Sequence, residues 1–209
     1  MADSIQATGI TAAMYVDLKR CIGCNACSLA CKQEFNVAIG ERWSEIYGAE
    51  KEDYPSVRVQ VLPMRCQQCN DAPCKTVCDN LKYFAIKRRP DGIVYVDPAL
   101  CVGCQKCVPV CPYKAMNFNT QKLNKLGKPG VAEKCNFCMQ RLDKGLLPAC
   151  VTTCLGVTLE YGSFNALRAK YPGAQQMGSS VGPKVLYGHM GDEPEQRTAG
   201  YPDAVPCHD

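Results

Sequence analysis

Apolar residues of the chain occur in short runs, separated by cysteines, glycines, prolines and charged residues. Three runs rich in β-branched and aromatic residues predict short strands at residues 13–16, 57–61 and 93–96. Pro90-Asp91-Gly92, a turn signal, directly precedes the third run. No run approaches the roughly 18 consecutive apolar residues that a membrane-spanning helix needs. The pattern therefore predicts small sheets joined by turns.

Helical signals are few and short. One helix is expected at residues 164–170 with Ser163 as its N-cap, and short helical segments are expected after each group of cysteines. Beyond residue 154 the chain is rich in Gly and Pro and has little hydrophobic periodicity. We therefore expect an α+β fold with an irregular C-terminal arm, residues 163–209, that contacts a partner.

The cysteines change this picture, because 17 of the 209 residues are Cys, close to the level of a cysteine-based scaffold. Cys207 stands alone, and the other sixteen form four groups of four. Groups one and three share the spacing C-x2-C-x2-C-x3-C. In chain order, the groups are Cys21, Cys24, Cys27 and Cys31; Cys66, Cys69, Cys74 and Cys78; Cys101, Cys104, Cys107 and Cys111; and Cys135, Cys138, Cys150 and Cys154.

Three chemistries use cysteines at this density. Disulfides suit small secreted proteins, but the cysteine count is odd and the N-terminus lacks the basic and apolar regions of a secretory signal. Structural zinc sites pair two short knuckles across a spacer, which group four resembles, group two resembles loosely, and groups one and three do not. The spacing of groups one and three is that of bacterial ferredoxins, in which three cysteines hold one 4Fe–4S cluster and the fourth holds its neighbour. Iron–sulfur clusters are the favoured interpretation, and a zinc-bound interaction protein is a rival.

An internal repeat supports two ferredoxin-like units. Residues 15–17, Tyr-Val-Asp, precede group one as residues 95–97, also Tyr-Val-Asp, precede group three, an offset of 80 residues. Gly23 and Gly103 each stand just before the second cysteine of a group, where they let the backbone bend closely around a cluster. A two-cluster unit needs eight cysteines, so the chain predicts two units and four 4Fe–4S clusters.

Several stretches around the cysteines are typical of one family. They are CQQCNDAPC at 66–74, KCNFC at 134–138, RLDKG at 141–145 followed by PAC at 148–150, and GPKVLY at 182–187. With all four groups in order over roughly residues 13–162, the chain resembles the four-cluster electron-transfer subunit of the molybdopterin oxidoreductases of the dimethyl-sulfoxide-reductase family. This resemblance implies a part in anaerobic respiration beside a large molybdenum- or tungsten-bis-pterin catalytic subunit.

The resemblance also implies a nested arrangement, which spacing alone leaves open. The unit of groups two and three, residues 63–130, would be inserted into the unit of groups one and four, residues 13–62 and 131–162. The cluster of the first ligand set would lie nearest the catalytic partner. The implied ligand sets are Cys21, Cys24, Cys27 and Cys154; Cys135, Cys138, Cys150 and Cys31; Cys66, Cys69, Cys74 and Cys111; and Cys101, Cys104, Cys107 and Cys78. Many relatives have Pro where Asp79 and Leu155 stand, and an ionised Asp79 should lower the potential of a nearby cluster.

A net charge of +4 is modest, and the basic run at residues 87–89 adjoins a turn without an aromatic-rich patch, so no nucleic-acid partner is expected. Each cluster with its four thiolates carries about −2, which turns the charge into roughly −4. Seven basic residues stand beside ligands in the sequence: Lys19, Arg20, Lys32, Lys75, Lys106, Lys114 and Lys134. They are either ordinary surface residues, or some of them tune the reduction potentials of the clusters or contact an acidic partner.

The favoured function is an electron relay between the catalytic subunit and a quinol-linked membrane anchor or soluble redox protein. The chain has no G-x-G-x-x-G, P-loop or G-x-S-x-G signature, and clusters with four cysteines leave no iron open to substrate, so it is not expected to be an enzyme by itself. The alternative is a stand-alone cytoplasmic polyferredoxin, for which a C-terminal arm would have no use.

The remaining expectations concern the histidines, Cys207 and the cellular location of the complex. His189 and His208, the only histidines, are expected at the surface, and Cys207 as a free thiol. Reduced thiols and cluster assembly require the cytoplasm during synthesis. The complex is expected either in the cytoplasm or, by co-export with the catalytic subunit, at the periplasmic face of the cytoplasmic membrane.

Overall fold

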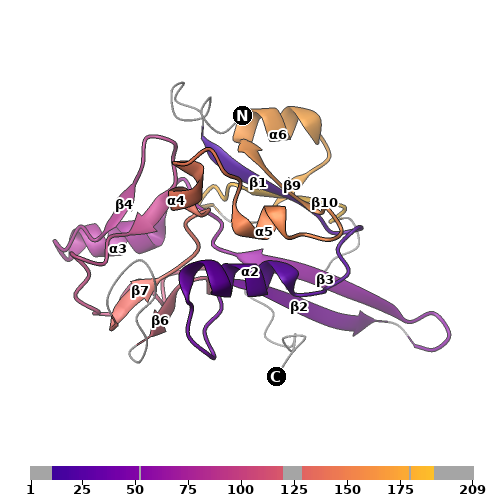
Figure 1. The fold of residues 1–209 in the computed structure, drawn as a ribbon, viewed down its shortest axis with the longest axis horizontal. Coiled ribbons are helices and arrows are strands. Elements are labelled where there is room, and N and C mark those ends of the chain that lie inside the picture. The colour runs from indigo at the N-terminus through magenta and orange to yellow at the C-terminus, as the bar shows by residue number, and fades with distance from the viewer. Residues whose placement is uncertain (1–10, 52, 120–128, 179, 191–209) are drawn as a thin grey trace.

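The computed structural model describes residues 11–51, 53–119, 129–178 and 180–190. Short strands and short helices together agree with the expected α+β class. None of the described helices is long and apolar enough to cross a bilayer. The elements (Figure 1) are β1 (Ala12–Asp17), α2 (Ala26–Phe35), β2 (Ser44–Lys51), β3 (Arg58–Arg65), α3 (Pro73–Asn80), β4 (Ile86–Arg88), β5 (Val94–Val96), β6 (Asn117–Asn119), β7 (Val131–Glu133), α4 (Met139–Leu142), α5 (Ala149–Thr152), β8 (Leu159–Ser163), α6 (Phe164–Lys170), β9 (Gln175–Gln176) and β10 (Val185–Gly188).

A four-stranded sheet in the order β8-β1-β10-β9 joins the two ends of the described chain. β1 pairs antiparallel with β8 and parallel with β10, and β9 pairs antiparallel with β10. β1 is buried on both faces: Met14 and Val16 belong to the main core, whereas Ala13 and Tyr15 pack under α6. The predicted strand at 13–16 is thus confirmed as the centre of the sheet.

The expectation of an irregular C-terminal arm was wrong for residues 163–188. α6, β9 and β10 lie in this segment, and all four residues of β10 are buried. A four-residue strand carries too little periodicity to be recognised, and its pairing partner β1 lies at the other end of the sequence. The helix at 164–170 is confirmed, with the Ser163 hydroxyl accepting a hydrogen bond from the Ala166 N–H at 3.2 Å. Residues 191–209, including Cys207 and His208, lie outside the described residues, and His189 is exposed.

Three two-stranded sheets complete the β structure of the described ranges. The β2–β3 hairpin is the longest and extends away from the body of the protein in Figure 1. It contains the predicted strand at 57–61, which continues to Arg65, whereas β2, with its charged residues and Gly48, was not predicted. The predicted turn at 90–92 is confirmed between β4 and β5, with Gly92 in the left-handed region at φ +81°. β6 pairs with β7.

The helices carry the cysteines instead of following them. α2 contains Cys27 and Cys31, and α3 contains Cys74 and Cys78, each pair four residues apart and therefore on one helix face. The helical segments expected after groups three and four were wrong, because residues 112–116 and 155–158 form turns and irregular structure. Residues 106–110, within group three, form turns where group one forms a helix. Pro109 lies inside this segment, and a proline removes a backbone donor and clashes with a continuing helix.

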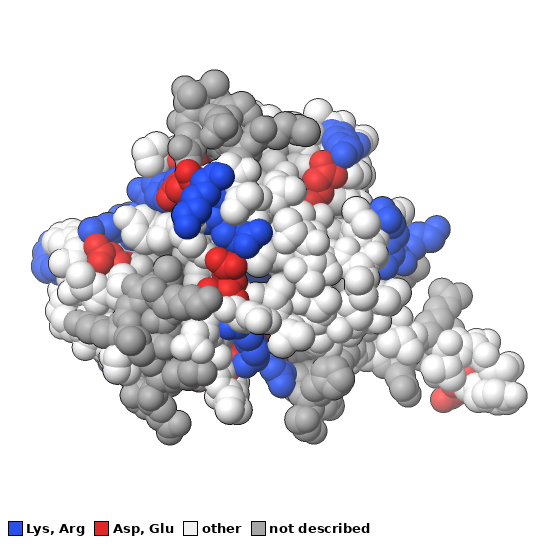
Figure 2. All heavy atoms as spheres, in the orientation of Figure 1, with Lys and Arg blue, Asp and Glu red and all other residues white. Residues whose placement is uncertain are grey.

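The main hydrophobic core includes most of the cysteines together with side chains such as Met14, Leu62 and Phe137, and a smaller core lies under α6. The expected boundary between residues 62 and 63 falls inside β3, and that between residues 162 and 163 falls inside β8. β3 thus crosses the expected boundary between the two units, and β8 crosses the expected start of the C-terminal arm. On the face in Figure 2, basic side chains lie in separate groups, often beside acidic ones, and much of the remaining described surface is uncharged.

Candidate iron–sulfur cluster sites

All four cysteine groups share one backbone feature. The residue just before the second cysteine has a positive φ in each group: Gly23 at +71°, Gln68 at +51°, Gly103 at +75° and Phe137 at +53°. Such left-handed residues turn successive peptide N–H groups towards one point, which creates an anion-binding concavity of the kind found at iron–sulfur sites. The bends expected at the two glycines are confirmed. The sequence did not reveal those at Gln68 and Phe137, because non-glycine residues seldom adopt this conformation.

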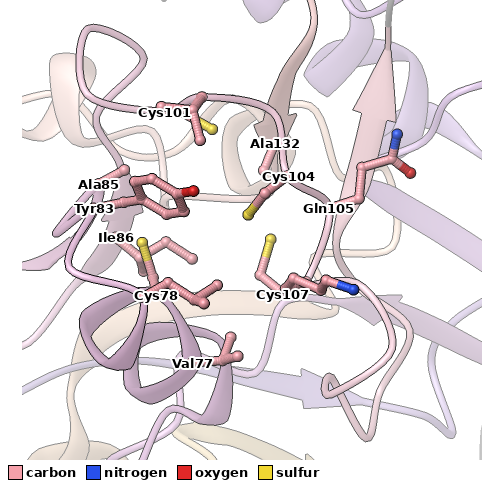
Figure 3. A pocket seen from close by; sticks show the side chains of 13 residues that line it. Val77, Cys78, Tyr83, Ala85, Ile86, Cys101, Cys104, Gln105, Cys107 and Ala132 are labelled. Atoms are coloured by element: carbon pink, nitrogen blue, oxygen red, sulfur yellow. The ribbon is translucent and has the colours of Figure 1, made fainter.

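Cysteines from two groups line one cavity beside α3, here called site IV. It is formed by Cys78, Cys101, Cys104 and Cys107, and Figure 3 shows their side chains around a common space. The lining of this cavity is largely apolar and includes Ala85 and Ile86. Cys104 is exposed, so this site reaches the molecular surface.

A second cavity, site I, is lined by cysteines from the first and last groups. Cys21, Cys24 and Cys27 of group one lie around it together with Cys154 of group four. Cys24 is exposed, as Cys104 is at site IV. The Thr158 hydroxyl lies 3.1 Å from the Cys154 Sγ, and the Thr158 N–H donates to the same sulfur at 3.3 Å.

The other eight cysteines form two inner groups. Site II comprises four buried cysteines, because the Cys31 thiol interacts electrostatically with Cys135, Cys138 and Cys150. Site III comprises Cys69 with Cys66, Cys74 and Cys111, of which only Cys111 is partly exposed. In all four sites the structure thus brings three cysteines of one group together with the last cysteine of another.

The four sites form a row. Cys27 of site I neighbours Cys150 of site II, Cys135 of site II neighbours Cys66 of site III, and Cys74 of site III neighbours Cys107 of site IV. In each consecutive pair of sites, a thiol of one site therefore lies next to a thiol of the other. The order is I, II, III, IV, with an exposed cysteine at each end and buried cysteines in the middle.

The donor geometry fits a group larger than one ion. A tetrahedral zinc site holds each sulfur about 2.3 Å from the metal, which puts the sulfurs within about 4 Å of one another. Within the described ranges, no three Cys, His, Asp or Glu side chains converge closely enough for a single ion. Four thiol ligands spread around a space suit a 4Fe–4S core, which a cysteine holds at each iron.

Burial shifts the thiols towards their neutral form. It raises the pKa of Cys69 and of Cys107 to about 12, and the neighbouring cysteines add to the rise. Burial also raises the pKa of Cys31 well above its usual value. Iron binding deprotonates such thiols outright, so cluster assembly in these sites releases protons.

Three basic side chains are buried near the inner sites: Arg65 and Lys134, which approach cysteine sulfurs, and Lys184, which is 2% exposed and interacts electrostatically with Cys66 and Cys69. Arg65 is 2% exposed, and one of its guanidinium nitrogens lies 3.6 Å from the Cys150 Sγ. Lys134 is 3% exposed, and its ammonium lies 3.3 Å from the Cys66 Sγ. Lys134 was one of the seven basic residues singled out beside ligands, whereas Arg65 was missed, although it directly precedes Cys66 in the sequence.

The other singled-out residues lie nearer the surface. Four of the basic residues are exposed, namely Lys19, Arg20, Lys106 and Lys114. Lys32 and Lys75 are half-buried. Lys75 forms an ion pair with Asp79. This pairing offsets the negative charge that we expected to lower a cluster potential. Leu155 is 75% exposed beside site I.

Left-handed cysteine loops around four groups of thiols define a ferredoxin-like iron–sulfur protein, and comparison with known proteins agrees. The 4Fe-4S dicluster domain family matches residues 57–164. The matching tetrathionate reductase subunit of Salmonella typhimurium is 41% identical over 69% of this chain and 54% of its own length. The thiosulfate reductase electron transfer subunit of Salmonella typhi is 40% identical over 71% of this chain and 74% of its own length. The arsenate respiratory reductase iron-sulfur subunit of a Shewanella species is 30% identical over 83% of this chain and 94% of its own length.

The chain belongs to this 4Fe–4S dicluster family of iron–sulfur subunits. Its match spans 54 to 62% of the length of three curated relatives. The family match includes cysteine groups two, three and four, while group one lies before it. The structure brings group one to group four, through Cys154 at site I and Cys31 at site II.

Proposed function

We propose that this chain is the electron-transfer subunit of a molybdenum- or tungsten-pterin oxidoreductase. It carries four 4Fe–4S clusters, in sites I to IV, and passes electrons between a catalytic subunit and a second redox partner. The observation that carries this proposal is the row of sites with an exposed cysteine at each end. A row that opens to the surface at two separate places suits entry of electrons at one end and exit at the other.

Apolar surface around both ends supports partner binding there. At site I, Ile22, Leu155 and Val157 are 71%, 75% and 68% exposed. At site IV, Val102 is 60% exposed and Leu81 is 42% exposed. Exposed apolar groups gathered at a functional opening are typical of protein interfaces. The catalytic subunit is proposed to bind at site I, and a quinol-linked anchor or soluble redox protein at site IV.

The proposed ligand sets are those of sites I to IV, with the unit of groups two and three inserted in the unit of groups one and four. Pairing of β1 with β8 supports this nesting, because it joins the segments before group one and after group four. The Cys31 thiol of α2 also interacts with Cys150 of α5, which connects the same two groups. The insertion then accounts for every site drawing its fourth cysteine from a different group.

The clusters supply one-electron chemistry, and the chain determines where it occurs. The cysteine thiolates would hold each cluster, the left-handed loops would direct peptide N–H groups at it, and the burial of every cysteine of sites II and III except Cys111 would limit contact with water there. Hydrogen bonds to the sulfurs and solvent exposure set the potential of each cluster. The cysteines of neighbouring sites lie close together, which would let electrons pass between clusters held there without leaving the protein.

Elemental analysis of the native complex, purified without oxygen, tests this function. About sixteen irons per chain, from four clusters of four, together with molybdenum or tungsten and a co-purifying large chain, are expected. Iron alone on a monomer would favour the stand-alone polyferredoxin. Zinc without iron would contradict the cluster assignment altogether. Fractionation of cells would then separate the two proposed locations, cytoplasm and periplasmic face of the membrane.

Paired cysteine variants test the ligand sets. Cys21→Ser and Cys154→Ser should disturb the same cluster in the electron paramagnetic resonance spectrum, and Cys78→Ser should disturb the cluster of group three. Cys207→Ser is the matched control, because this cysteine belongs to none of the proposed ligand sets. A Cys154→Ser protein that lost the signal of the Cys101 cluster would contradict the nested arrangement.

A further inference from the structure

Arg65 stands at the junction of sites I and II without an acidic partner among the described residues. Its guanidinium interacts most strongly with Cys150 of site II, then with Cys27 of site I, and a Met14 sulfur lies 2.9 Å from one of its nitrogens. The Nε and Nη2 groups are buried and have no hydrogen-bond partner within the described part of the protein. Because a buried charged donor is costly when left unpaired, these N–H groups need acceptors that the described residues do not supply.

Lys134 occupies the corresponding place between sites II and III. Its ammonium donates to the Val94 carbonyl, to the Cys135 carbonyl at 3.1 Å and to the Cys66 Sγ at 3.3 Å. These three acceptors match the three N–H groups of a charged ammonium. No carboxylate of the described residues forms an ion pair with it, so its charge is directed at the cysteines of the two inner sites.

The basic residues that adjoin the outer sites in sequence are not buried in this way. Lys106, next to Cys107 of site IV, is exposed, and so are Lys19 and Arg20, which precede Cys21 of site I. Water screens an exposed charge strongly, whereas a buried charge acts through a medium of low effective dielectric. Arg65 and Lys134, together with the buried Lys184, which interacts electrostatically with Cys66 and Cys69 of site III, therefore distinguish the middle of the row from its ends.

We propose that Arg65 and Lys134 are fixed counter-charges of the inner clusters, which raise the reduction potentials at sites II and III and make the middle of the row its preferred place for electrons. This proposal rests on the proposed function. A reduced cluster carries one more negative charge than the oxidised cluster, because one electron is added and no ligand is lost. A fixed positive charge nearby stabilises the reduced state more, and hydrogen bonds to the sulfurs act in the same direction.

The test compares neutral with charge-preserving replacements in the complete complex. Arg65→Gln and Lys134→Gln remove the charge but keep hydrogen-bond donors, whereas Arg65→Lys and Lys134→Arg keep the charge. Lys106→Gln is the matched control, since it removes an exposed charge beside Cys107. The readout is a potentiometric titration followed by electron paramagnetic resonance, with each signal assigned by the cysteine variants and iron counted in every sample.

Each glutamine variant is expected to lower the potential of its inner cluster, so that the ratio of reduced to oxidised cluster at a fixed potential falls at least tenfold, which is about 59 mV for one electron. Arg65→Gln should act mainly at site II and less at site I. Lys134→Gln should act mainly at site III and less at site II. The charge-preserving variants and Lys106→Gln should shift these ratios by less than about threefold.

Three results would overturn the proposal: full iron with unchanged potentials in the glutamine variants, equal shifts in charge-preserving and neutral variants, or loss of inner-cluster iron in both kinds. Loss of iron in the neutral variants alone, with full iron and unchanged potentials in the charge-preserving ones, would support it, since charge is then what the site requires. A wild-type complex with no iron would refute the proposed function instead. That result is read before any variant is compared.

Discussion

Gly103 offers a sharp test of how the cysteine loops are built. Its φ is +75°, and a Cβ atom placed on it would lie 2.3 Å from the carbonyl oxygen of Gly130. Gly23, the equivalent residue of group one, has φ +71°, but its Cβ would lie 3.4 Å from the Val61 side chain, an ordinary contact. Gly103→Ala and Gly23→Ala thus share the backbone strain and differ in the clash.

The magnitudes follow from these two contributions. An alanine in the left-handed region costs about 1–2 kcal/mol, which both variants should lose. Forcing extra volume against a packed backbone costs about 1–3 kcal/mol more, which applies only at Gly103. At about 2–4 °C per kcal/mol for a domain of this size, the apparent melting temperature should fall by roughly 2–8 °C for Gly23→Ala and roughly 4–20 °C for Gly103→Ala, with the second variant always the less stable.

The assay is anaerobic thermal unfolding of the cluster-loaded protein, followed by cluster absorbance at one fixed heating rate because such unfolding is often irreversible. Iron counts accompany it, and Gly103→Ala should lose iron from site IV before any other site. Equal melting temperatures in the two variants would refute the reasoning, because the clash with Gly130 would then carry no weight.

Three further predictions concern single side chains. Thr158→Val, which removes the hydroxyl 3.1 Å from the Cys154 sulfur, should lower the potential of the cluster at site I alone; an unchanged potential in a redox titration would contradict this. Ser163→Ala should destabilise the protein by about 1 kcal/mol through loss of the α6 cap, measured as a small drop in melting temperature. Burial and neighbouring thiols raise the pKa of Cys69 to about 12, so after removal of iron Cys69 should be alkylated far more slowly at pH 8.5 than the exposed Cys24. The alkylation rate of Cys69 should rise about tenfold per pH unit towards pH 12, because the thiolate is the reactive form. Equal alkylation rates of the two cysteines in peptide mass spectrometry would contradict this prediction.

Much of the candidate site could be predicted from the sequence, because ligand chemistry is local. Three cysteines within seven residues, with a glycine before the second, describe a loop that wraps one cluster regardless of what surrounds it. The same is true of α6, whose Ser163 cap and residue pattern are contained in eight positions. The turn at 90–92 likewise needs only its own residues.

Errors arose where the outcome depends on distant parts of the chain. β10 becomes a strand because β1 offers it a parallel partner, and neither segment reveals this alone. One difference has a local cause: residues 106–110 of group three form turns with Pro109 among them, whereas group one, with the same cysteine spacing and no proline between its cysteines, forms α2. Equal spacing therefore did not produce equal secondary structure.

The sequence by itself determined the number of clusters to expect, the cysteines available to hold them and the family, since these follow from residue types at fixed short spacings. Only the tertiary structure decided which cysteines come together at each site, the order of the sites in a row, and the burial of Arg65 and Lys134 between them. These features arise where segments far apart in the chain pack together. The field that a buried charge exerts depends on that packing, because it is the exclusion of water that makes the charge effective.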